Sequence, residues 1–338
     1  MKAVTQTLSI VCALVLFMGN TLTAQRAIFV EETYADADFD LSNSEIPSWE
    51  LIPGGPGKDG IPALTDPSFT LAKKDKWLAD DDRVIGITRN GVSKAYPISI
   101  LNYHEVINDD FKGERVAITY SPLCGSVMVY RTETGQEQWE LAVSGLLYNN
   151  NALYYDRNTQ SLWSQLHGRA VAGPVAGAEL DLLPSTYTTW GEWKERNPET
   201  LLLASETGYN RNYEMDSYAH YATTDRLMFP LNYSDERLNL KERVLGVNID
   251  GVYKAYPYKA FSDQEDSVVQ DVVNGQTIQI EFLAQPQAAY VTDLEGTPLP
   301  SSSTYWFAWS SFHPETALFN PETDEFTTDI SMSLGMVK

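Results

Sequence analysis

The chain has 338 residues, of which 43% are hydrophobic and 21% are charged, and this balance excludes a wholly disordered protein. Lysine and arginine number 24 against 46 aspartates and glutamates, so the formal net charge at pH 7 is −22. A surface this acidic repels phosphate backbones and anionic headgroups, which argues against nucleic acid or the membrane surface as a partner. The two cysteines, Cys12 and Cys124, exclude a framework of several disulfides.

The first residues are typical of an export signal. Lys2 supplies a positive charge, residues 8–18 form an apolar stretch too short to span a bilayer, and a small-residue cleavage site ends at Ala24. We therefore expect an exported protein, periplasmic or secreted after cleavage near Ala24. It would have no membrane attachment after that cleavage, and Cys124 would be its single thiol. An uncleaved anchor helix is the alternative.

An internal repeat organises the rest of the chain. The string RVIGITRNGVSKAYP at 83–97 recurs as RVLGVNIDGVYKAYP at 243–257, and VINDDFKGERVAITY is matched by VVQDVVNGQTIQIEF. A third match pairs the tryptophans and the Pro-Glu-Thr of 190–200 with those of 306–316. Three matches in the same order indicate a duplication. The second and third matches lie closer together in the second copy, so the first copy carries an insert.

Each copy is predicted to begin with a β-hairpin, because the pairs Asn-Gly at 90–91 and Asp-Gly at 250–251 tolerate positive φ at both positions. A short helix is expected over 98–106, and residues 116–120 alternate in hydrophobicity like a strand with one buried face. A short helix with paired tryptophans is expected within 181–196. We therefore predict an α+β, β-rich fold. Two internally duplicated sheet-plus-short-helix units would pack together, with an insert in the first copy.

The predicted organisation of the chain follows the repeat. Residues rich in glycine and proline precede the first copy, and they are expected to wrap around a core that they do not form themselves. In chain order the predicted segments are a signal peptide (1–24), an N-terminal wrapping segment (25–80), copy one (81–205) with a site-bearing insert (131–189), a connecting segment (206–241), copy two as a degenerate scaffold (242–322) and a C-terminal tail (323–338).

Chemistry is expected in copy one, because its candidate residues have no counterparts in copy two. Cys124 lies in a loop with proline and glycine at the end of a strand, where copy two has Pro286. A thiol becomes reactive when a neighbouring imidazolium stabilises its thiolate, and His104 lies on the preceding helix. We therefore predict a thiol-dependent enzyme, redox or nucleophilic, with His104 as base or thiolate partner and Asn102 or Asn150 orienting the pair. A buried cysteine that acts as a small hydrophobe is the alternative.

Two other hypotheses remain open. In the second, the chain binds copper or zinc, since thiolate and imidazole together favour these metals; the ligands would be Cys124 and His104, completed by His167 or Met128. In the third, the chain is a non-catalytic scaffold that binds a glycan or a protein through the insert. The candidate substrate-binding residues of the insert are Tyr148, Asn150, Tyr155, Arg157 and Trp163.

Five long strings occur in order over about residues 45–265: GGPGKDGIPALTDPSF, DDRVIGITRNGVSKAYPISILNYHEVIND, ITYSPLCGSVMVY, SGLLYNNNALYYDRNTQSLWSQLHG and GEWKERNPETLLL. Together they resemble the family called domain of unknown function 3179. Some members of that family carry selenocysteine in the matching loop, so the resemblance implies redox or nucleophilic work at Cys124.

The family's usual loop resembles Tyr-Cys-Pro-Leu-Cys-Gly, and this chain has Ser121 where the first cysteine often stands. Serine cannot resolve a sulfenic acid, so a dithiol cycle within the loop is not expected here. His104 matches the Asn-x-His-Glu motif of the family, and Tyr155, Arg157 and Trp163 match its insert motif. The expected partner is an unidentified small molecule or an exported redox partner.

Overall fold

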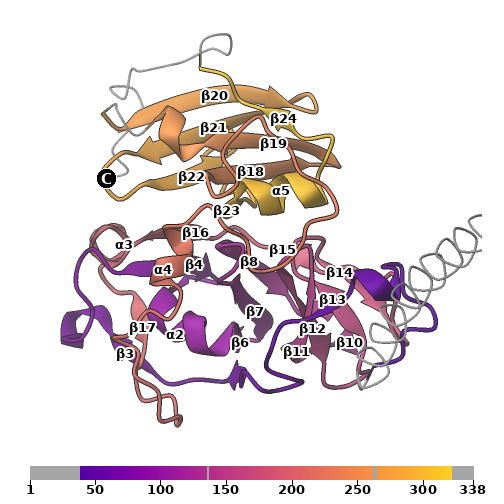
Figure 1. Cartoon of the computed structure of the whole chain (residues 1–338). Helices are drawn as coiled ribbons and strands as arrows, with labels where there is room; N and C mark the ends of the chain where they lie inside the picture. Colours follow the sequence, from indigo (N-terminus) through magenta and orange to yellow (C-terminus); the bar gives the residue numbers. More distant parts are fainter. Residues whose placement is uncertain (1–38, 135–136, 262–264, 322–338) are drawn as a thin grey trace, which may run out of the picture.

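A computed structural model describes residues 39–134, 137–261 and 265–321 (Figure 1). The predicted signal peptide (1–24), the beginning of the wrapping segment and the predicted C-terminal tail (323–338) lie outside the described residues. Within the described ranges, no helix is both long enough and apolar enough to cross a membrane. Strands dominate this part of the chain, and its helices are short.

Three sheets are built from the first two thirds of the described chain. The insert sheet has the order β1 (Ile52–Pro53), β11 (Leu141–Tyr148), β12 (Asn151–Asp156), β13 (Leu162–Ser164) and β14 (Arg169–Ala172). The cysteine sheet has the order β15 (Asp181–Leu182), β8 (Ser126–Arg131), β7 (Glu114–Ser121), β6 (Val106–Phe111) and β2 (Leu64–Thr65). The first hairpin sheet has the order β16 (Thr186–Thr189), β4 (Arg83–Arg89), β5 (Val92–Pro97), β17 (Leu201–Leu203) and β3 (Phe69–Leu71).

Two further sheets come from the rest of the described chain. The second hairpin sheet has the order β23 (Ser302–Tyr305), β18 (Arg243–Ile249), β19 (Val252–Pro257) and β24 (Ala317–Leu318). The three-stranded sheet contains β20 (Ser267–Val273), β21 (Gln276–Leu283) and β22 (Ala288–Thr292). A ribbon of β9 (Glu133–Thr134) and β10 (Glu137–Gln138) lies apart from these sheets.

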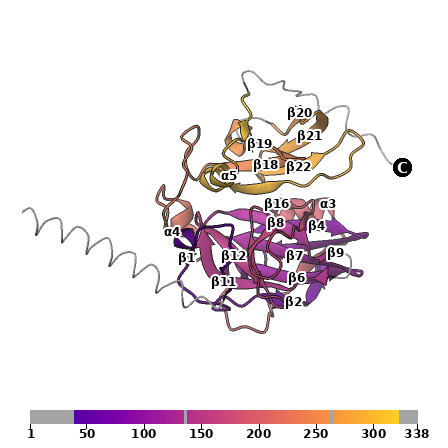
Figure 2. The ribbon, with the colours of Figure 1, turned by 90° about the vertical axis from the view of Figure 1, so that its right-hand side faces the viewer.

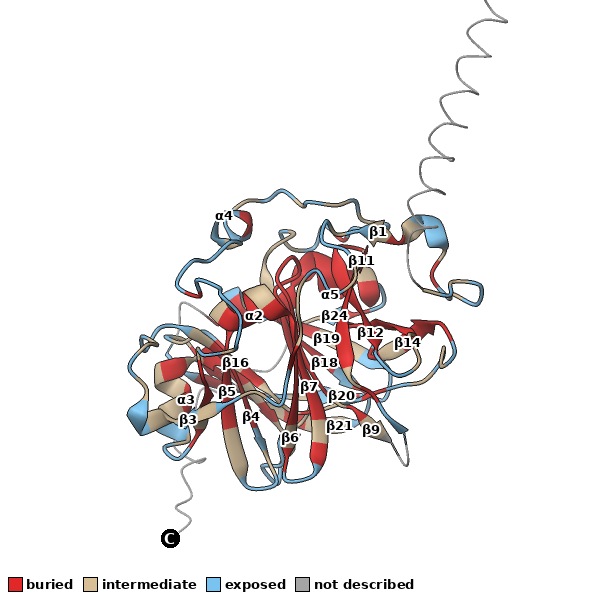
Figure 3. Ribbon diagram, turned by 90° about the horizontal axis from the view of Figure 1, so that it is seen from below, coloured by how far each residue is buried: buried red, intermediate tan, exposed pale blue. Residues whose placement is uncertain are grey.

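The helices are single turns or little more. The α-helices are α2 (Ile98–His104), α3 (Trp190–Arg196), α4 (Ala219–Ala222) and α5 (Trp306–Phe312), and the 3₁₀ turns are η1 (Ser48–Glu50), η2 (Ala72–Lys74) and η3 (Tyr258–Ala260). The helix expected over 98–106 is therefore present, and it ends two residues earlier than predicted. Viewed from below, α4 lies at the exposed periphery, whereas the strands around α2 and α5 are mostly buried (Figure 3).

The predicted fold class is wrong. Among the described residues, five small sheets lie in a ring and form a five-bladed β-propeller, not two packed sheet-plus-helix units. In each hairpin sheet, both edges of the hairpin are already paired: β16 and β17 flank β4–β5, and β23 and β24 flank β18–β19. The strands that follow each hairpin must therefore form sheets of their own. The insert, which was expected to decorate one unit, supplies the fifth sheet.

The sheets meet through a few strand contacts. Strand β8 contacts β23, and β16 contacts β22, so the two sheets from 243–318 lie over those from the first part of the chain (Figure 2). Strand β11 contacts β6, which joins the insert sheet to the cysteine sheet. This arrangement brings the beginning of β4, the end of β7 and the beginning of β18 toward one region.

The two repeated strings form the predicted hairpins. Asn90 and Gly91 have φ of 51° and 70°, and Asp250 and Gly251 have φ of 48° and 85°, as a type I′ turn requires. Strands β4 and β5 pair from Val84↔Pro97 to Arg89↔Val92, and β18 and β19 pair in the same way from Val244↔Pro257 to Ile249↔Val252. The hairpins are therefore equivalent local elements, although they belong to different sheets of the ring.

A tryptophan packs on the backbone of each hairpin. A Cβ atom added to Gly86 would lie 2.2 Å from the ring of Trp193, and one added to Gly246 would lie 2.2 Å from the ring of Trp309. The indole nitrogen of Trp193 donates to Thr200 at 2.9 Å, and that of Trp309 donates to Thr316 at 2.9 Å. Glycine is required at both hairpins because any side chain would displace the indole.

Candidate functional site

Cys124 lies in the tight turn that connects β7 to β8. Its amide donates to the carbonyl of Ser121 at 3.1 Å, and its own carbonyl accepts from the amide of Tyr305 at 2.9 Å. The thiol is free and fully buried. Burial raises its pKa to about 12, hydrogen bonds from Asn151 and Ser121 oppose the rise, and the nearby Glu105 adds to it. The turn therefore buries the thiol.

His104 ends α2 and does not serve as the partner of this thiol. Its Nδ1 lies 2.7 Å from the carbonyl oxygen of Pro62, and its Nε2 lies 2.6 Å from the hydroxyl of Tyr213. Because a carbonyl can only accept, Nδ1 carries the proton and Nε2 accepts from Tyr213. Burial lowers the pKa of the ring, so the neutral form is favoured. The structure therefore does not bring the predicted catalytic pair together through a hydrogen bond.

The five candidate residues of the insert do not form an open binding platform. Tyr155 and Trp163 are each only 1% exposed. The Tyr155 hydroxyl donates to Asp59 at 2.7 Å, and the Trp163 indole donates to Asp156 at 3.0 Å. Buried rings with satisfied polar atoms have packing roles. The structure therefore does not support the predicted glycan-binding platform on these two rings.

The other insert candidates hold neighbouring segments in place. Tyr148 packs edge-on against Phe312, with ring centroids 5.4 Å apart. The Asn150 side chain accepts from the amide of Phe229 at 2.9 Å and donates to its carbonyl at 3.0 Å. Arg157 forms ion pairs with Asp59 and Glu140, each at 3.2 Å. These contacts secure chain segments, and they do not converge on one cavity.

The proposed metal ligands are separated as well. The Met128 sulfur accepts from the hydroxyl of Ser302 at 3.0 Å, and the His167 ring lies 4.8 Å from that of Phe312. Both nitrogens of His104 are engaged by other groups, as described above. In the described part of the chain, no group of three or more histidine, cysteine, aspartate or glutamate side chains could hold a metal ion. The donor set predicted for copper or zinc therefore does not fit a metal centre.

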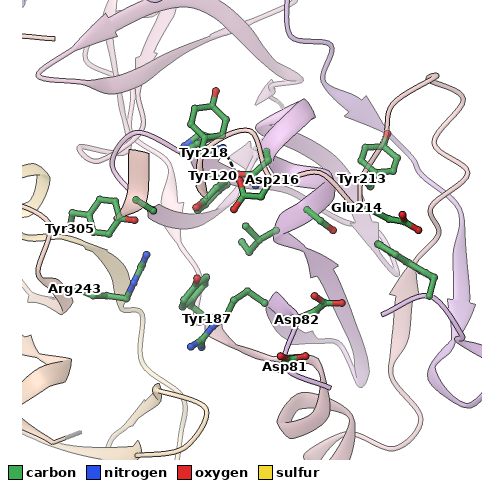
Figure 4. Close-up of a pocket in the computed structure, with 17 residues that line it drawn as sticks. Asp81, Asp82, Tyr120, Tyr187, Tyr213, Glu214, Asp216, Tyr218, Arg243 and Tyr305 are labelled. Carbon is green, nitrogen blue, oxygen red and sulfur yellow. Dashed lines mark hydrogen bonds between the residues drawn. The ribbon is translucent and has the colours of Figure 1, made fainter. Parts of the chain in front are cut away.

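A pocket lies where the starts of the two repeated hairpins approach each other (Figure 4). Its volume is about 560 Å³, within the range of small-molecule sites. We call it the tyrosine–arginine pocket and define it by its charged, tyrosine and asparagine lining residues: Asp81, Asp82, Arg83, Asn102, Tyr120, Tyr187, Tyr213, Glu214, Asp216, Tyr218, Arg243 and Tyr305. Asn102 is the one predicted catalytic residue that lines it.

Two arginines with no carboxylate partner in the described chain line this pocket. Arg83 begins β4 and Arg243 begins β18, so they occupy the same place in the two repeated strings. Both guanidinium groups lie against the ring of Tyr187, at 5.2 Å and 4.7 Å from its centroid, and Arg243 also lies 4.9 Å from that of Tyr305. Their hydrogen bonds go to neutral acceptors: Arg83 donates to the carbonyl of Pro286, and Arg243 to that of Gly125 at 3.0 Å.

The opposite side of the pocket is acidic. Figure 4 places Arg243 and Tyr305 at one side, and Asp81, Asp82 and Glu214 at the other. None of these three carboxylates forms an ion pair with a described residue of the pocket. The pocket thus has Arg243 at one end and three carboxylates at the other, with tyrosines and the Asp216 carboxylate between them. Burial raises the pKa of Tyr120 and of Tyr305, so their hydroxyls stay protonated at neutral pH.

Asn102 lines the pocket and has one hydrogen-bond acceptor without a partner. Its amide group donates to Asp216 at 3.1 Å, whereas its side-chain oxygen is buried and has no hydrogen-bond partner. An unsatisfied buried acceptor is uncommon and needs an explanation. Because Asn102 lines the pocket, a ligand that donates a hydrogen bond would supply the missing partner.

Sequence reasoning missed the residues that give this pocket its charge. A signal was available for the arginines, since each repeated string begins with Arg-Val, at 83 and at 243. The residues of 213–218 carry no comparable signal, because they come from the connecting segment, which has no repeat partner. The acidic pair at 81–82 could be recognised only once the structure placed it opposite Arg243.

The comparisons with known proteins identify the family of this chain. No curated protein and no solved structure matches the chain. The match to a family covers residues 58–316, which is most of the chain and includes both repeated hairpins and the tyrosine–arginine pocket. The chain therefore belongs to the family described as "Protein of unknown function (DUF3179)".

Proposed function

We propose that this protein binds a small organic acid that also carries hydroxyl or amino groups, in the tyrosine–arginine pocket. An anionic group of the ligand would lie beside Arg243 and Arg83, and hydroxyl or amino groups would lie toward Asn102 and the acidic side. The observation that carries the proposal is the Arg243 guanidinium, which faces the pocket between two tyrosine rings without a carboxylate partner in the described chain.

The electrostatics of Arg243 support an anionic ligand. Removing a guanidinium from water costs several kcal/mol, and this cost is met when an anion pairs with it in good geometry. Contact with an aromatic ring offsets only about 0.5–2 kcal/mol. The chain has many acidic residues, yet none pairs with Arg83 or Arg243 among the residues described. The planar guanidinium is well suited to bind a carboxylate through two hydrogen bonds.

The acidic side of the pocket determines which groups the rest of the ligand can carry. Asp81, Asp82 and Glu214 would repel a molecule that carries negative charge throughout. Carboxylates and the free Asn102 oxygen accept hydrogen bonds, so they favour hydroxyl or amino groups. The tyrosine rings between the two ends suit a ligand with a flat or apolar middle. This division of charge is the reason for proposing an organic acid with hydrogen-bond donors and not a simple anion.

Thiol chemistry at Cys124 stays a prediction, and the geometry gives it less support. The thiol is fully buried, its pKa is raised by that burial, and His104 bonds to other groups. A nucleophilic cysteine needs both access and a stabilised thiolate. The pocket offers access and charge, and so it is the better supported site.

The test uses 4-hydroxybenzoate as the probe, with benzoate and benzyl alcohol as matched compounds. We expect saturable binding of 4-hydroxybenzoate in titration calorimetry, weaker binding of benzoate because it lacks the donor, and no measurable binding of benzyl alcohol. Arg243→Gln should weaken the binding of 4-hydroxybenzoate by about tenfold or more, since a charge-assisted pair is lost.

Arg157→Gln is the control, because Arg157 is a half-exposed arginine whose ion pairs lie away from the pocket. It should leave the affinity unchanged. If Arg243→Gln lowers stability, Asn102→Asp tests the same site from the other end: the new carboxylate should weaken the binding of both acids. Equal binding of 4-hydroxybenzoate to the wild type and to both pocket variants would contradict the proposal.

A further inference from the structure

A second and smaller cavity lies behind the turn that holds Cys124. Its volume is about 70 Å³, and its polar lining consists of Glu105, Ser121 and Tyr218. The remaining walls are mostly apolar and come from the loop before β2 and from the insert sheet, with Ile61, Leu146 and Ala152 among them. We call it the Glu105 cavity. It is distinct from the tyrosine–arginine pocket, although Pro122 and Tyr218 line both.

Glu105 is the unusual residue of this cavity. Its side chain is 93% removed from solvent, at 7% exposure, and its carboxyl forms no hydrogen bond or ion pair within the described residues. Its backbone has φ 56° and ψ −33°, a conformation that is strained for glutamate. Burial alone raises the pKa of the carboxyl to about 8. Backbone strain and an unpartnered buried acid in one residue indicate a functional constraint.

The matching position in the second repeat lacks this acid. Alignment of EVINDDF with SVVQDVV places Ser267 opposite Glu105, and Asp271 opposite Asp109. Ser267 is also buried, so burial of the position belongs to the framework, whereas the carboxyl does not. The fold can therefore be built with a small neutral side chain here. The burial of the Glu105 carboxyl therefore costs free energy that the framework does not require.

We propose that the Glu105 cavity binds a small alkylammonium ion, with the Glu105 carboxylate as its counter-ion. A carboxylate only accepts hydrogen bonds, so its partner must be a donor, and a cation is the donor that compensates its charge. The Ser121 and Tyr218 hydroxyls supply two further acceptors for an ammonium group. The apolar walls suit a short alkyl group. One water molecule occupies about 30 Å³ in the liquid, so a cavity of this size holds roughly two or three heavy atoms. Methylammonium has this size.

The charge of the chain acts in the same direction. A net charge of −22 raises the concentration of cations around the molecule. When a cation binds, the carboxylate form of Glu105 is stabilised, and the proton that the free site holds at neutral pH is released. Affinity should therefore increase with pH until the free carboxyl is ionised, and proton release should disappear above that point.

The test is a calorimetric titration of the full chain with methylammonium chloride at pH 6, 7, 8 and 9. We expect an affinity that rises by up to tenfold for each pH unit below 8 and levels off above it. The buffer takes up the released proton, so the observed heat at pH 7 should differ between buffers of different ionisation enthalpy. At pH 9 no proton is released, and the heat should be the same in all of them. Tetramethylammonium, which is too large for the cavity, and potassium chloride should give no saturable heat.

Glu105→Gln should abolish methylammonium binding, because the amide has the size of the acid without its charge. Glu140→Gln is the matched control, since Glu140 is a half-exposed acid paired with Arg157, and it should bind as the wild type does. Absence of methylammonium binding by the folded wild type at pH 9, or equal binding by Glu105→Gln, would overturn the proposal.

A measurement on the wild type covers the case in which Glu105→Gln does not fold. With ¹³C-labelled glutamate, the Glu105 carboxyl resonance should titrate near pH 8 and shift to a lower midpoint in the presence of methylammonium. A midpoint that does not move would overturn the proposal. Neither experiment depends on the tyrosine–arginine pocket, whose probe is an organic acid, so the two proposals can fail separately.

Discussion

The two repeated segments, 83–131 and 243–292, share a framework and differ in chemistry. In the first, Lys94 forms an ion pair with Asp109 at 2.7 Å, and Tyr96 donates to the same carboxylate at 2.5 Å. In the second, Lys254 and Tyr256 contact Asp271, each at 2.7 Å. The buried ion pair and the glycine–tryptophan contact are thus both duplicated. They belong to the construction of a hairpin and its neighbouring strand.

The differences fall on a few positions. The first segment has Glu105 where the second has Ser267, and Cys124 where the second has Pro286. The helix that follows the first hairpin, α2, is replaced by the single turn η3 in the second. The Glu105 carboxyl and the Asn102 oxygen of the first segment have no partner among the described residues, whereas at the position of Glu105 the second segment leaves only the small Ser267 hydroxyl unpaired. We conclude that the duplicated ion pair and the duplicated glycine–tryptophan contact hold the fold, whereas the paired arginines at the hairpin starts and the differing positions are where function should be tested.

The largest effect is expected at the buried ion pair. Asp109→Asn should lower the free energy of unfolding by about 3–5 kcal/mol, because it leaves the Lys94 ammonium buried without its counter-ion. Asp271→Asn should cost less, since the second pair is 15% and 16% exposed against 9% and 6% for the first. Urea unfolding of the two variants measures the comparison. Equal losses would show that the two pairs carry equal weight.

The pH dependence of stability should distinguish an acid at this position, Glu105, from the neutral side chain of Ser267 in the second segment. The folded state holds the Glu105 proton until about pH 8, whereas the unfolded chain releases it near 4.5. The wild type should therefore lose stability as the pH rises from 4.5 to about 8, at no more than about 1.4 kcal/mol per pH unit. Glu105→Gln removes this loss, and Glu105→Ser copies the second segment.

The measurement is urea unfolding of wild type and Glu105→Gln at pH 5 and pH 8.5. The variant should gain stability relative to the wild type at the higher pH. Parallel profiles for the two proteins would mean that Glu105 is ionised in the folded state and has a partner.

Gly86→Ala and Gly246→Ala test the shared framework directly. Each added methyl group would meet a tryptophan ring at 2.2 Å, so both variants should lose about 1–3 kcal/mol of stability from overpacking. Because the two contacts have the same geometry, the losses should agree within about 0.5 kcal/mol. Thermal unfolding followed by tryptophan fluorescence is the measurement. A loss confined to one variant would break the equivalence of the hairpins.

The smallest effect is expected at the ends of the tryptophan helices. Asn197 and His313 have nearly the same backbone angles, and His313 stacks on Tyr253 with centroids 3.9 Å apart. Burial, with a contribution from His167, lowers the pKa of His313 to about 3. The unfolded chain takes up this proton below about 6.5, so stability should fall as the pH falls from 6.5 toward 3.

His313→Asn copies the first segment and should remove this contribution. At pH 7 we expect a cost of about 1 kcal/mol from the lost stacking, and at pH 4.5 we expect that cost to shrink or reverse. Chemical unfolding at the two pH values measures the difference. A constant cost across this range would show that His313 is protonated in the folded state as readily as in the unfolded chain.

Local elements could be predicted from the sequence because local chemistry determines them. The Asn-Gly and Asp-Gly pairs require positive φ, and alternation at 116–120 identified part of β7. The architecture could not be predicted in the same way. It depends on β17 and β24, short strands that pair with the hairpins in parallel from far along the chain. Neither strand is long enough to carry a periodic signal.

The candidate site shows the same limit. Closeness along one small unit suggested that His104 would reach Cys124, but Pro62 and Tyr213 bind the imidazole instead. Their carbonyl and hydroxyl come from segments that were expected to wrap or connect. Asn102 was singled out for orienting a thiol, and the structure places it at the wall of a pocket. Residue type identified polar positions of interest, whereas their partners were set by contacts distant in sequence.

The two arginines at the hairpin starts have a consequence for synthesis of the protein. Arg83 donates to the carbonyl of Pro286, and Arg243 donates to that of Gly125, so each reaches across to a turn of the other segment. Tyr305, which closes the pocket beside Arg243, comes later still in the chain. The insert and the first hairpin can fold while translation continues. The tyrosine–arginine pocket cannot form until Arg243 and Tyr305 have both left the ribosome, so a product truncated before Tyr305 would keep its local folds and lack the complete pocket.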